Sequence, residues 1–313
     1  MRIKGDGEQR GVAAVTALLI VAVAASAASL MLVQQSAMLG QTSLVASRAQ
    51  AELYGRAGLD WARGVLADDA KRAADFDALN EAWAQPMVGL PVDRAIVSGA
   101  IVDEQGKFNL NNLLKDGKSS GEDMATLKRL LESLGLSADL RDAVLDWIDK
   151  DSDLYGSGGA ENPYYLALGA PYRAADQPMI QVEELYRIRG FDAKTVAKLR
   201  PYITALPSLQ GHTTVNANTA SATVLAALLP ELAPADIANL IKAREEKPFR
   251  SKDDITRAAK NINPAALGAL DVKSSFFSVR VRVAQDDVQI GTEALVQRDP
   301  AAGVAVVWRR PLY

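Results

Sequence analysis

A long apolar stretch at residues 12–33 constrains this chain more than any other feature of its sequence. Only three residues within it are polar, Thr16, Ser26 and Ser29. A short charged leader that ends at Gly11 precedes the stretch. A helix rises about 1.5 Å per residue, so a helix of this length extends roughly 30 Å, the thickness of the hydrocarbon core of a bilayer. The sequence therefore predicts one membrane-spanning helix at residues 12–34.

Two alternatives differ in whether this stretch stays in the mature protein. A basic start and the tripeptide at residues 25–27 are similar to a cleaved secretory signal, but the apolar run is long for the core of such a signal. Downstream, residues 34–70 contain no proline and repeat apolar residues at helical spacing. This pattern favours the second alternative, one long helix that continues from the membrane onto a globular body.

The rest of the chain has strand patterns at both ends and helical patterns between them. A hairpin is expected at residues 95–109 with its turn at 103–106, and strands return at 276–284, 288–297 and 304–309. A short helical piece is expected at 75–83, before the hairpin. The other expected helices span residues 124–134, 138–148, 182–188, 193–199, 220–229, 234–244 and 252–258, with Ser137, Asp192, Thr219 and Ser251 as candidate caps.

This order of elements predicts an α+β fold. A lone hairpin is only marginally stable, so we expect the first hairpin to complete the sheet of the C-terminal strands, with the long N-terminal helix packed on that antiparallel sheet. The sheet domain would comprise residues 35–112 and 273–313, and a large all-α domain would be inserted at 113–272. The chain has 313 residues and no cysteine, which fits one large or two ordinary domains and excludes disulfide bonds.

Acidic residues cluster after the helix expected at 138–148. The carboxylates of this loop, at residues 146–165, belong to Asp146, Asp149, Asp151, Asp153 and Glu161, with a glycine-rich turn at 156–159. Such a gathering of hard oxygen ligands suits Ca²⁺. The loop is not an EF-hand, because the sixth and twelfth positions counted from Asp149 are Leu154 and Ala160. On spacing alone, a solvated acidic loop remains the alternative.

The sequence gives little support for catalysis or for nucleic-acid binding. The formal net charge of -3 opposes binding that depends on phosphate contacts. The only histidine, His212, lies in an expected loop with no evident nucleophile or acid partner, and is interpreted as an exposed loop residue. We therefore expect a protein that is not an enzyme.

The junction between the leader and the apolar helix resembles the class III signal of type IV pilins and type II secretion pseudopilins. The resemblance implies that a prepilin peptidase cuts after Gly11 and N-methylates Val12, and that the hydrophobic helix is retained. Most members of these families have glutamate at the fifth residue after the cut, where this chain has Thr16. That departure matches one family, the minor pseudopilin K (GspK) of type II secretion, in which the glutamate is absent.

Motifs in the expected insertion extend this resemblance. The acidic loop reads Asp-Trp-x-Asp-x-Asp and then Gly-Ala-Glu-Asn-x-Tyr, which is similar to the segment where the pseudopilin K family binds calcium. The resemblance implies a structural Ca²⁺ ion with Asp149, Asp151 and Glu161 as ligands, and with Asp153 and Asn162 as further candidates. Other similar segments lie at residues 170–179, where Asp176 replaces an asparagine, and at 183–185, 199–207 and 215–220.

Residues 215–260 also support an alternative from a different class. This part resembles the helix-hairpin-helix modules of DNA-binding competence proteins, so a membrane-anchored DNA-binding protein is the second hypothesis. Its hairpin at 229–234 lacks glycine, contains two prolines that remove N–H donors, and places Glu231 where phosphate would bind. We therefore expect no nucleic-acid partner.

The resemblance to pseudopilin K implies a place and a set of partners. It implies a single-pass protein of the inner membrane with a periplasmic C-terminal domain, at the tip of the type II secretion pseudopilus that supports export of folded proteins across the outer membrane. The implied partners are the minor pseudopilins I and J and then the major pseudopilin. Thr16 fits a tip position, because an unpaired carboxylate in lipid is costly and a tip subunit has no subunit ahead to pair with it.

Overall fold

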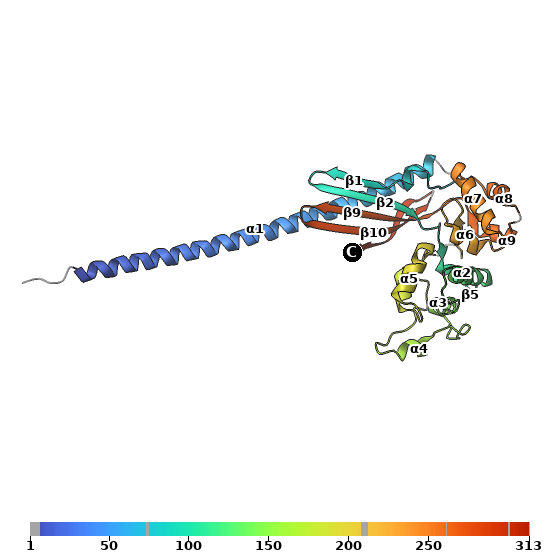
Figure 1. The fold of residues 1–313 in the computed structure, drawn as a ribbon, viewed down its shortest axis with the longest axis horizontal. Coiled ribbons are helices and arrows are strands. Elements are labelled where there is room, and N and C mark those ends of the chain that lie inside the picture. Colours follow the sequence, from blue (N-terminus) through green and yellow to red (C-terminus); the bar gives the residue numbers. More distant parts are fainter. Residues whose placement is uncertain (1–6, 73–74, 208–211, 261, 300, 313) are drawn as a thin grey trace, which may run out of the picture.

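One helix dominates the computed structural model, which describes residues 7–72, 75–207, 212–260, 262–299 and 301–312. Helix α1 (Gly7–Arg72) extends far from the body at its N-terminal end and packs on the body with its C-terminal end (Figure 1). Residues 11–46 are exposed along their whole length, and the helix is long and apolar enough to cross a membrane. The predicted single continuous helix is confirmed.

A five-stranded antiparallel sheet receives the second half of α1. Its strands lie in the order β1 (Met87–Val92), β2 (Ala95–Asp103), β9 (Phe276–Gln285), β10 (Val288–Asp299) and β11 (Gly303–Pro311). Strand β2 pairs with β9, so segments far apart in the sequence form the middle of the sheet. The buried apolar residues of α1 and of the facing strands are Ala51, Leu59, Ala62, Leu66, Val97, Ile101, Val279, Val281 and Val283. At Gly58 a Cβ atom would lie 2.8 Å from the Val281 side chain, so glycine permits the close approach of helix and sheet.

The first hairpin lies earlier in the chain than the sequence predicts. Strands β1 and β2 are joined by a turn at Asp93, whose φ is 50°, and Val92 pairs with Ala95. The hairpin expected around 103–106 is wrong: the chain turns there, but it leaves the sheet, and the next strand, β3 (Phe108–Asn109), pairs with β6 (Ile203–Thr204) instead of β2. Pro91 is tolerated in β1 because β1 is an edge strand, whose free edge needs no N–H donor. The helical piece expected at 75–83 is reduced to a 3-10 turn at Ala82–Ala84, and residues 73–74 lie outside the described part.

The insertion lies between Asp103, the last residue of β2, and Phe276, the first residue of β9, and it is mainly helical. Its α-helices are α2 (Gly121–Ser133), α3 (Leu140–Ile148), α4 (Asn162–Leu166), α5 (Ala193–Leu199), α6 (Ala222–Leu228), α7 (Pro234–Glu246), α8 (Lys252–Ala258) and α9 (Pro264–Gly268). Its 3-10 helices are Leu110–Leu113, Val182–Arg187 and Arg200–Tyr202. Its short strands are β3 (Phe108–Asn109), β4 (Leu114–Lys115), β5 (Lys118–Ser119), β6 (Ile203–Thr204), β7 (Val215–Asn216) and β8 (Leu270–Asp271).

Most helices of the insertion agree with the sequence prediction. Asp192 and Ser251 cap α5 and α8 as predicted. Ser221, and not Thr219, caps α6, so the helix begins later than expected. Ser137 accepts a hydrogen bond from the backbone of Asp139 but lies before the first turn of α3. Helices α4 and α9 were not predicted, because elements of five residues are too short to show helical periodicity.

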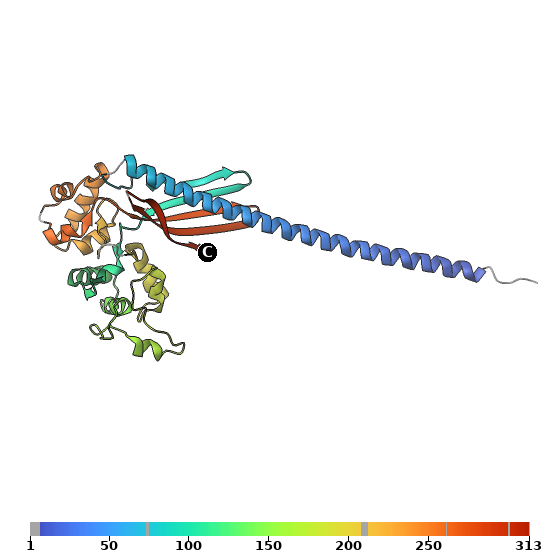
Figure 2. The ribbon, with the colours of Figure 1, turned by 180° about the vertical axis from the view of Figure 1, so that it is seen from behind.

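The insertion contains two hydrophobic cores and lies beyond one end of the sheet. One core joins α2, α3 and α5, and the other joins α6, α7 and α8. Figures 1 and 2 place the insertion at the end of the sheet away from the free part of α1. A segment beside the first core also contacts the face of the sheet opposite α1: Glu183, in the 3-10 helix Val182–Arg187, pairs with Arg310 of β11 at 2.7 Å. The predicted α+β fold with an inserted helical domain is confirmed.

Candidate metal centre

Helix α3 positions the acidic loop and shapes its glycine-rich turn. Asp142 and Asp146 are four residues apart, so their side chains lie on one face of the helix. Asp142 Oδ2 accepts a hydrogen bond from Gly158 N at 3.3 Å, and Asp146 Oδ1 accepts one from Tyr155 N at 3.1 Å. A Cβ atom at Gly159 would clash with the Asp146 carboxylate, so only glycine allows the turn to lie this close to α3. The side chain of Asp146 therefore holds the loop by accepting a hydrogen bond from the loop backbone.

Three carboxylates converge where α3 ends and α4 begins. Asp149 is the C-cap of α3 and Glu161 the N-cap of α4, and both side chains are buried, whereas Asp151 is exposed. Each of the three offers one carboxylate oxygen, and these oxygens lie within 4.8 Å of one another. Calcium binds oxygen at 2.3–2.6 Å, so two ligands of one ion lie at most about 5 Å apart. The spacing is that of oxygens able to share one cation.

The hydrogen bonding of this group fits a cation. Asp149 Oδ1 and both carboxylate oxygens of Glu161 are buried and have no hydrogen-bond partner among the described residues. Burial, followed by the charge of Asp151, raises the pKa of Asp149 to about 7. Burial, followed by the charge of Asp146, raises the pKa of Glu161 to about 7. Burial of a carboxylate without a hydrogen-bond donor costs free energy. Ca²⁺ prefers ligands that are all oxygen atoms, as these are. The residues present therefore fit the ion that the sequence predicted.

The two further candidate ligands lie outside this group. Asp153 is exposed, and its N–H donates to Asp151 Oδ1 at 2.9 Å. Asn162 Oδ1 accepts a hydrogen bond from Ala174 N at 3.1 Å, which joins the start of α4 to the segment that follows that helix. The structure thus brings together Asp149, Asp151 and Glu161. The backbone of Asp153 instead contacts Asp151, and the side chain of Asn162 contacts Ala174.

The insertion and the whole chain are both similar to known proteins. Two family models described as type II secretion system (T2SS), protein K match residues 106–208 and 215–276. The type II secretion system protein K of Aeromonas hydrophila is 33% identical over 311 residues, which cover 93% of either chain. This chain belongs to the type II secretion system protein K family. The protein K of Pseudomonas aeruginosa is 34% identical over 259 residues, 80% of this chain and 76% of the relative.

The fold of this protein K family member also matches a solved structure. A chain in the crystal structure of the GspK-GspI-GspJ complex from enterotoxigenic Escherichia coli superposes with a TM-score of 0.77 and 23% identity, over 87% of this chain and 99% of that one. The predicted resemblance to pseudopilin K is confirmed. Because a protein K model matches residues 215–276, the segment that resembles a helix-hairpin-helix module belongs to this family as well.

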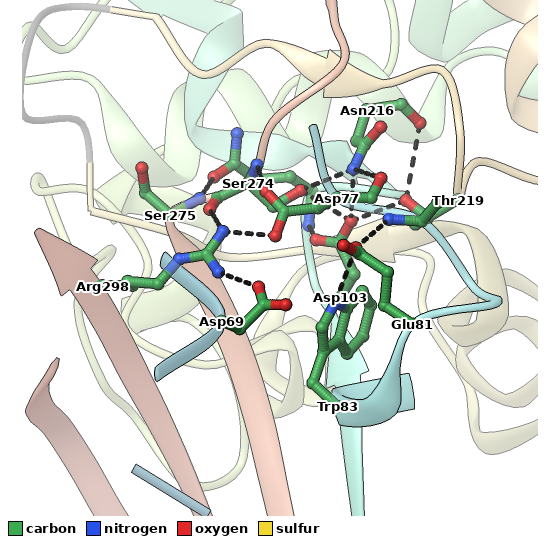
Figure 3. Close-up of polar contacts among 12 residues, drawn as sticks. Asp69, Asp77, Glu81, Trp83, Asp103, Asn216, Thr219, Ser274, Ser275 and Arg298 are labelled. Atoms are coloured by element: carbon green, nitrogen blue, oxygen red, sulfur yellow. Dashed lines mark hydrogen bonds and ion pairs between the residues drawn. The ribbon is translucent and has the colours of Figure 1, made fainter. Parts of the chain in front are cut away.

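A second group of acidic residues lies where the protein K insertion joins the sheet. We call it the junction cluster; it comprises Asp69, Asp77, Glu81, Asp103, Asn216, Thr219, Ser274 and Arg298 (Figure 3). Arg298 Nη1 donates to Asp69 at 2.7 Å, and Nη2 donates to Asp77. Glu81 Oε2 accepts from Ala78 N at 2.7 Å and from Trp83 Nε1 at 3.0 Å. The guanidinium of Arg298 supplies the positive charge here, so the cluster is a polar contact between segments.

Asp103 forms the centre of the junction cluster. Its Oδ2 accepts from Ser274 Oγ at 2.6 Å, Thr219 Oγ1 at 2.6 Å and Asn216 Nδ2 at 3.0 Å, as Figure 3 shows. Asp103 is the last residue of β2 and Ser274 precedes β9, so the cluster joins the two points where the chain enters and leaves the insertion. Burial raises the pKa of Asp103 to about 6. Sequence analysis missed this cluster because its members are far apart in the chain.

His212 differs from its predicted environment. Its Nε2 lies 3.2 Å from Asp123 Oδ1 and 3.3 Å from Asn112 Nδ2, and its side chain is 24% exposed. The interpretation of His212 as an exposed loop residue without an acid partner is therefore wrong. Ser120 Oγ donates to Asp123 Oδ2 at 2.5 Å and caps α2. Ser120 thus donates to the carboxylate of Asp123. A nucleophilic serine would instead donate to the imidazole that acts as its general base.

Proposed function

We propose that this chain is the minor pseudopilin at the tip of the type II secretion pseudopilus and supports export of folded proteins across the outer membrane. Membership of the protein K family supports this role. The observation on which the proposal depends most is the position of the insertion, beyond the end of the sheet away from the free part of α1 (Figure 1). A subunit of the same type added at that end would meet the insertion, which is the obstruction expected of a terminal subunit.

The membrane anchor of the proposed tip subunit is residues 12–34, with the C-terminal domain in the periplasm. A prepilin peptidase would cut after Gly11 and N-methylate Val12. The hydroxyl of Thr16 donates to the carbonyl of Val12 at 2.9 Å and lies 3.0 Å from that of Ala13, so its polarity is satisfied inside the helix. Thr16 therefore places no charge in the lipid, which favours a subunit without a partner ahead of it.

The proposed partners are the minor pseudopilins I and J, followed by the major pseudopilin. The similar chain from enterotoxigenic Escherichia coli was solved in a GspK-GspI-GspJ complex, and this supports the same association here. The exposed apolar residues of α1 beyond the expected span, among them Leu44, Leu53 and Trp61, would contact neighbouring helices of the filament.

A structural calcium ion completes the proposal. Asp149, Asp151 and Glu161 would hold it, and its positive charge would neutralise the buried carboxylates and fix the start of α4 against the end of α3. No role in catalysis is proposed for any residue.

Two measurements test the proposed function. N-terminal sequencing of the mature membrane protein should give a methylated Val12, whereas a start near Ala28 and a soluble periplasmic protein would contradict the anchor. Coexpression of the tagged full-length chain with the I and J subunits of its own secretion system should yield a complex of all three in detergent. If the membranes contain the I and J subunits but the tagged chain is recovered with neither of them, the proposed tip assembly is contradicted.

A further inference from the structure

A cleft of about 470 Å³ lies between the two hydrophobic cores of the insertion. Helix α2 of the first core forms one wall, which Glu122, Thr126 and Arg129 line. The end of α6, the segment after it and helix α9 form the other wall, on the side of the second core. Ligand sites are commonly clefts of roughly 300–1,000 Å³ at such boundaries between packed units. The cleft therefore has the size and the place of a binding site.

The space between the two walls is open. Gly121 of α2 and Gly268 of α9 line the cleft from opposite walls, and both are exposed. A Cβ atom at either glycine would meet no atom of another segment within 4 Å. Ala265 on the α9 wall is exposed as well, so the small residues leave room beside that helix. A segment of a larger molecule can therefore enter the cleft from solvent.

Arg129 lines the cleft with a half-buried positive charge. Its Nε donates to the carbonyl of Ala227 at 2.7 Å, and its Nη2 donates to Thr126 Oγ1 at 3.1 Å. Both acceptors are uncharged, and Arg129 forms no ion pair with any residue that the structure describes. Burial lowers the pKa of Arg129 and outweighs the opposing charge of Glu231. The guanidinium is thus held in place at the cleft without a counter-ion.

The acidic residues of the walls already have partners or are solvated. Asp123 accepts from Ser120 Oγ, and His212 Nε2 lies 3.2 Å from its other oxygen. Glu231 Oε1 accepts from Asn263 N at 2.8 Å, and Glu122 is exposed. These contacts leave Arg129 as the half-buried charge that a ligand can pair with.

We propose that this cleft binds a short polypeptide segment through a carboxylate, which pairs with the guanidinium of Arg129. A guanidinium binds a carboxylate through charge-assisted hydrogen bonds that are about twice as strong as neutral ones. The small residues of the α9 wall let a backbone approach closely, and the open cleft admits part of a longer chain. The bound segment would contact both cores of the insertion. This inference depends neither on the proposed tip position nor on the calcium ion.

Four probes identify the ligand chemistry, with ligand-observed NMR titration of the full-length chain in detergent as the measurement. The first probe is acetyl-Ala-Ala-Glu-Ala-amide, and the second is the same peptide with glutamine in place of glutamate. The third is the glutamine peptide with a free C-terminal carboxylate, and the fourth is acetate. Both peptides with a carboxylate should bind at least ~10-fold more tightly than the neutral peptide, because only they form the charge-assisted pair. Acetate should bind more weakly than either.

A pair of charge variants tests the role of Arg129. Arg129→Gln should weaken binding of the glutamate peptide at least ~10-fold, since it removes the charge that pairs with the carboxylate. Lys128→Gln is the matched control, because Lys128 is the preceding residue of α2 but is exposed, pairs with Glu132 and does not line the cleft. It should bind the peptide like the wild type.

A pair of glycine variants tests the cleft while Arg129 stays in place. Gly268→Leu adds a side chain to the open space and should weaken binding of the glutamate peptide at least ~10-fold. Gly169→Leu is its control, because Gly169 is also exposed with no atom of another segment within 4 Å of its Cβ position, but it does not line the cleft. This second pair keeps the proposal testable if Arg129→Gln fails to fold.

Each outcome decides the proposal. Failure of both carboxylate peptides to bind would overturn it, and so would unchanged binding in Gly268→Leu. Equal weakening by Arg129→Gln and Lys128→Gln would show attraction by net charge alone and would also overturn it. Acetate that binds as tightly as the peptides would indicate a site for small organic acids and exclude the polypeptide ligand. Preference between the two carboxylate peptides would support the proposal and show whether a side chain or a chain end supplies the carboxylate.

Discussion

Two acidic groups in this protein contain the same kinds of residue but differ in how their oxygens are satisfied. In the acidic loop at residues 146–165, oxygens of Asp149 and Glu161 are buried without a hydrogen-bond donor among the described residues. In the junction cluster, Asp77 and Asp103 are equally buried, yet Arg298, Ser274 and neighbouring groups donate to them. The two groups therefore differ in their hydrogen-bond donors and not in their acidity, and only the acidic loop leaves buried carboxylate oxygens for a cation to contact.

The two groups also differ in how the chain builds them. Asp149, Asp151 and Glu161 lie within one loop, and the buried oxygens of Asp149 and Glu161 have no hydrogen-bond donor among the described residues. Asp69, Asp77 and Arg298 come from α1, the segment after it and β10. Asn216, Thr219 and Ser274 come from the insertion, so the junction cluster forms when the insertion and the sheet meet. The first group should depend on an added ion and the second on the fold itself.

Removal of the internal cation should have the largest effect. Arg298→Met should destabilise the protein by about 3–5 kcal/mol, since it leaves the buried Asp77 charge uncompensated. The loss should be the same with calcium and with chelator, as measured by urea unfolding of the full-length chain. Arg48→Met is the control, because the Arg48–Glu52 pair is exposed at 71% and 50% and should contribute less than about 1 kcal/mol. A loss for Arg298→Met that vanishes in calcium would contradict the comparison.

Removal of the proposed ion should have the next largest effect. Calcium at about 100 times its Kd should stabilise the protein by about 2.7 kcal/mol. For a domain of this size that corresponds to a rise in Tm of roughly 5–10 °C. Thermal unfolding of the full-length chain in calcium and in excess chelator measures the difference. An unchanged Tm in chelator would show that the loop is stable without an ion.

Much of the fold could be predicted from the sequence because its elements are periodic. The long apolar run, the helices of the insertion and the C-terminal strands each extend over enough residues to show their period. The first hairpin was misplaced because residues 103–106 have turn chemistry, yet Asp103 uses its side chain to accept from Ser274 and Thr219, which are remote in sequence. Tertiary hydrogen bonds of this kind leave no local signal.

The candidate site divides in the same way. Asp149, Asp151 and Glu161 could be identified because they are close in sequence and follow a recognisable motif. The junction cluster could not, because only the fold brings Arg298 to Asp69 and Asp77. Asn216 and Thr219 were noticed as part of a motif, but their interaction with Asp103 required the structure.

Substitution of one proposed ligand should stabilise the ion-free protein and destabilise the calcium-bound protein. Glu161→Gln should raise the stability in chelator by about 1 kcal/mol, because the buried side chain then has no charge to desolvate. In saturating calcium the same variant should be less stable than the wild type, since a ligand is lost. Asp103→Asn is the contrast, because it replaces an acceptor of four hydrogen bonds and should destabilise in both conditions. Equal effects of Glu161→Gln in the two conditions would remove Glu161 from the ligand set.

A change of pH should produce the smallest effect, and it should weaken only the stabilisation that calcium provides. In the ion-free protein the pKa of Asp149 and that of Glu161 are raised to about 7, so lowering the pH through 7 adds protons that compete with calcium. Each competing proton costs at most about 1.4 kcal/mol of calcium stabilisation per pH unit, so the calcium-induced gain should fall by about 1 kcal/mol between pH 7.5 and 6.5.

The junction cluster should lose no stability under the same change. The folded pKa of Asp103 is raised from 3.8 to about 6, so the folded protein binds this proton more tightly than the unfolded chain. Stability from that proton is fully present below the unfolded pKa and is lost as the pH rises through 6. Lowering the pH from 7.5 to 6.5 should therefore not weaken the cluster, and the unfolding free energy in chelator should not decrease. A calcium-induced gain that stays constant over this range would show that Asp149 and Glu161 are not the groups that bind the ion.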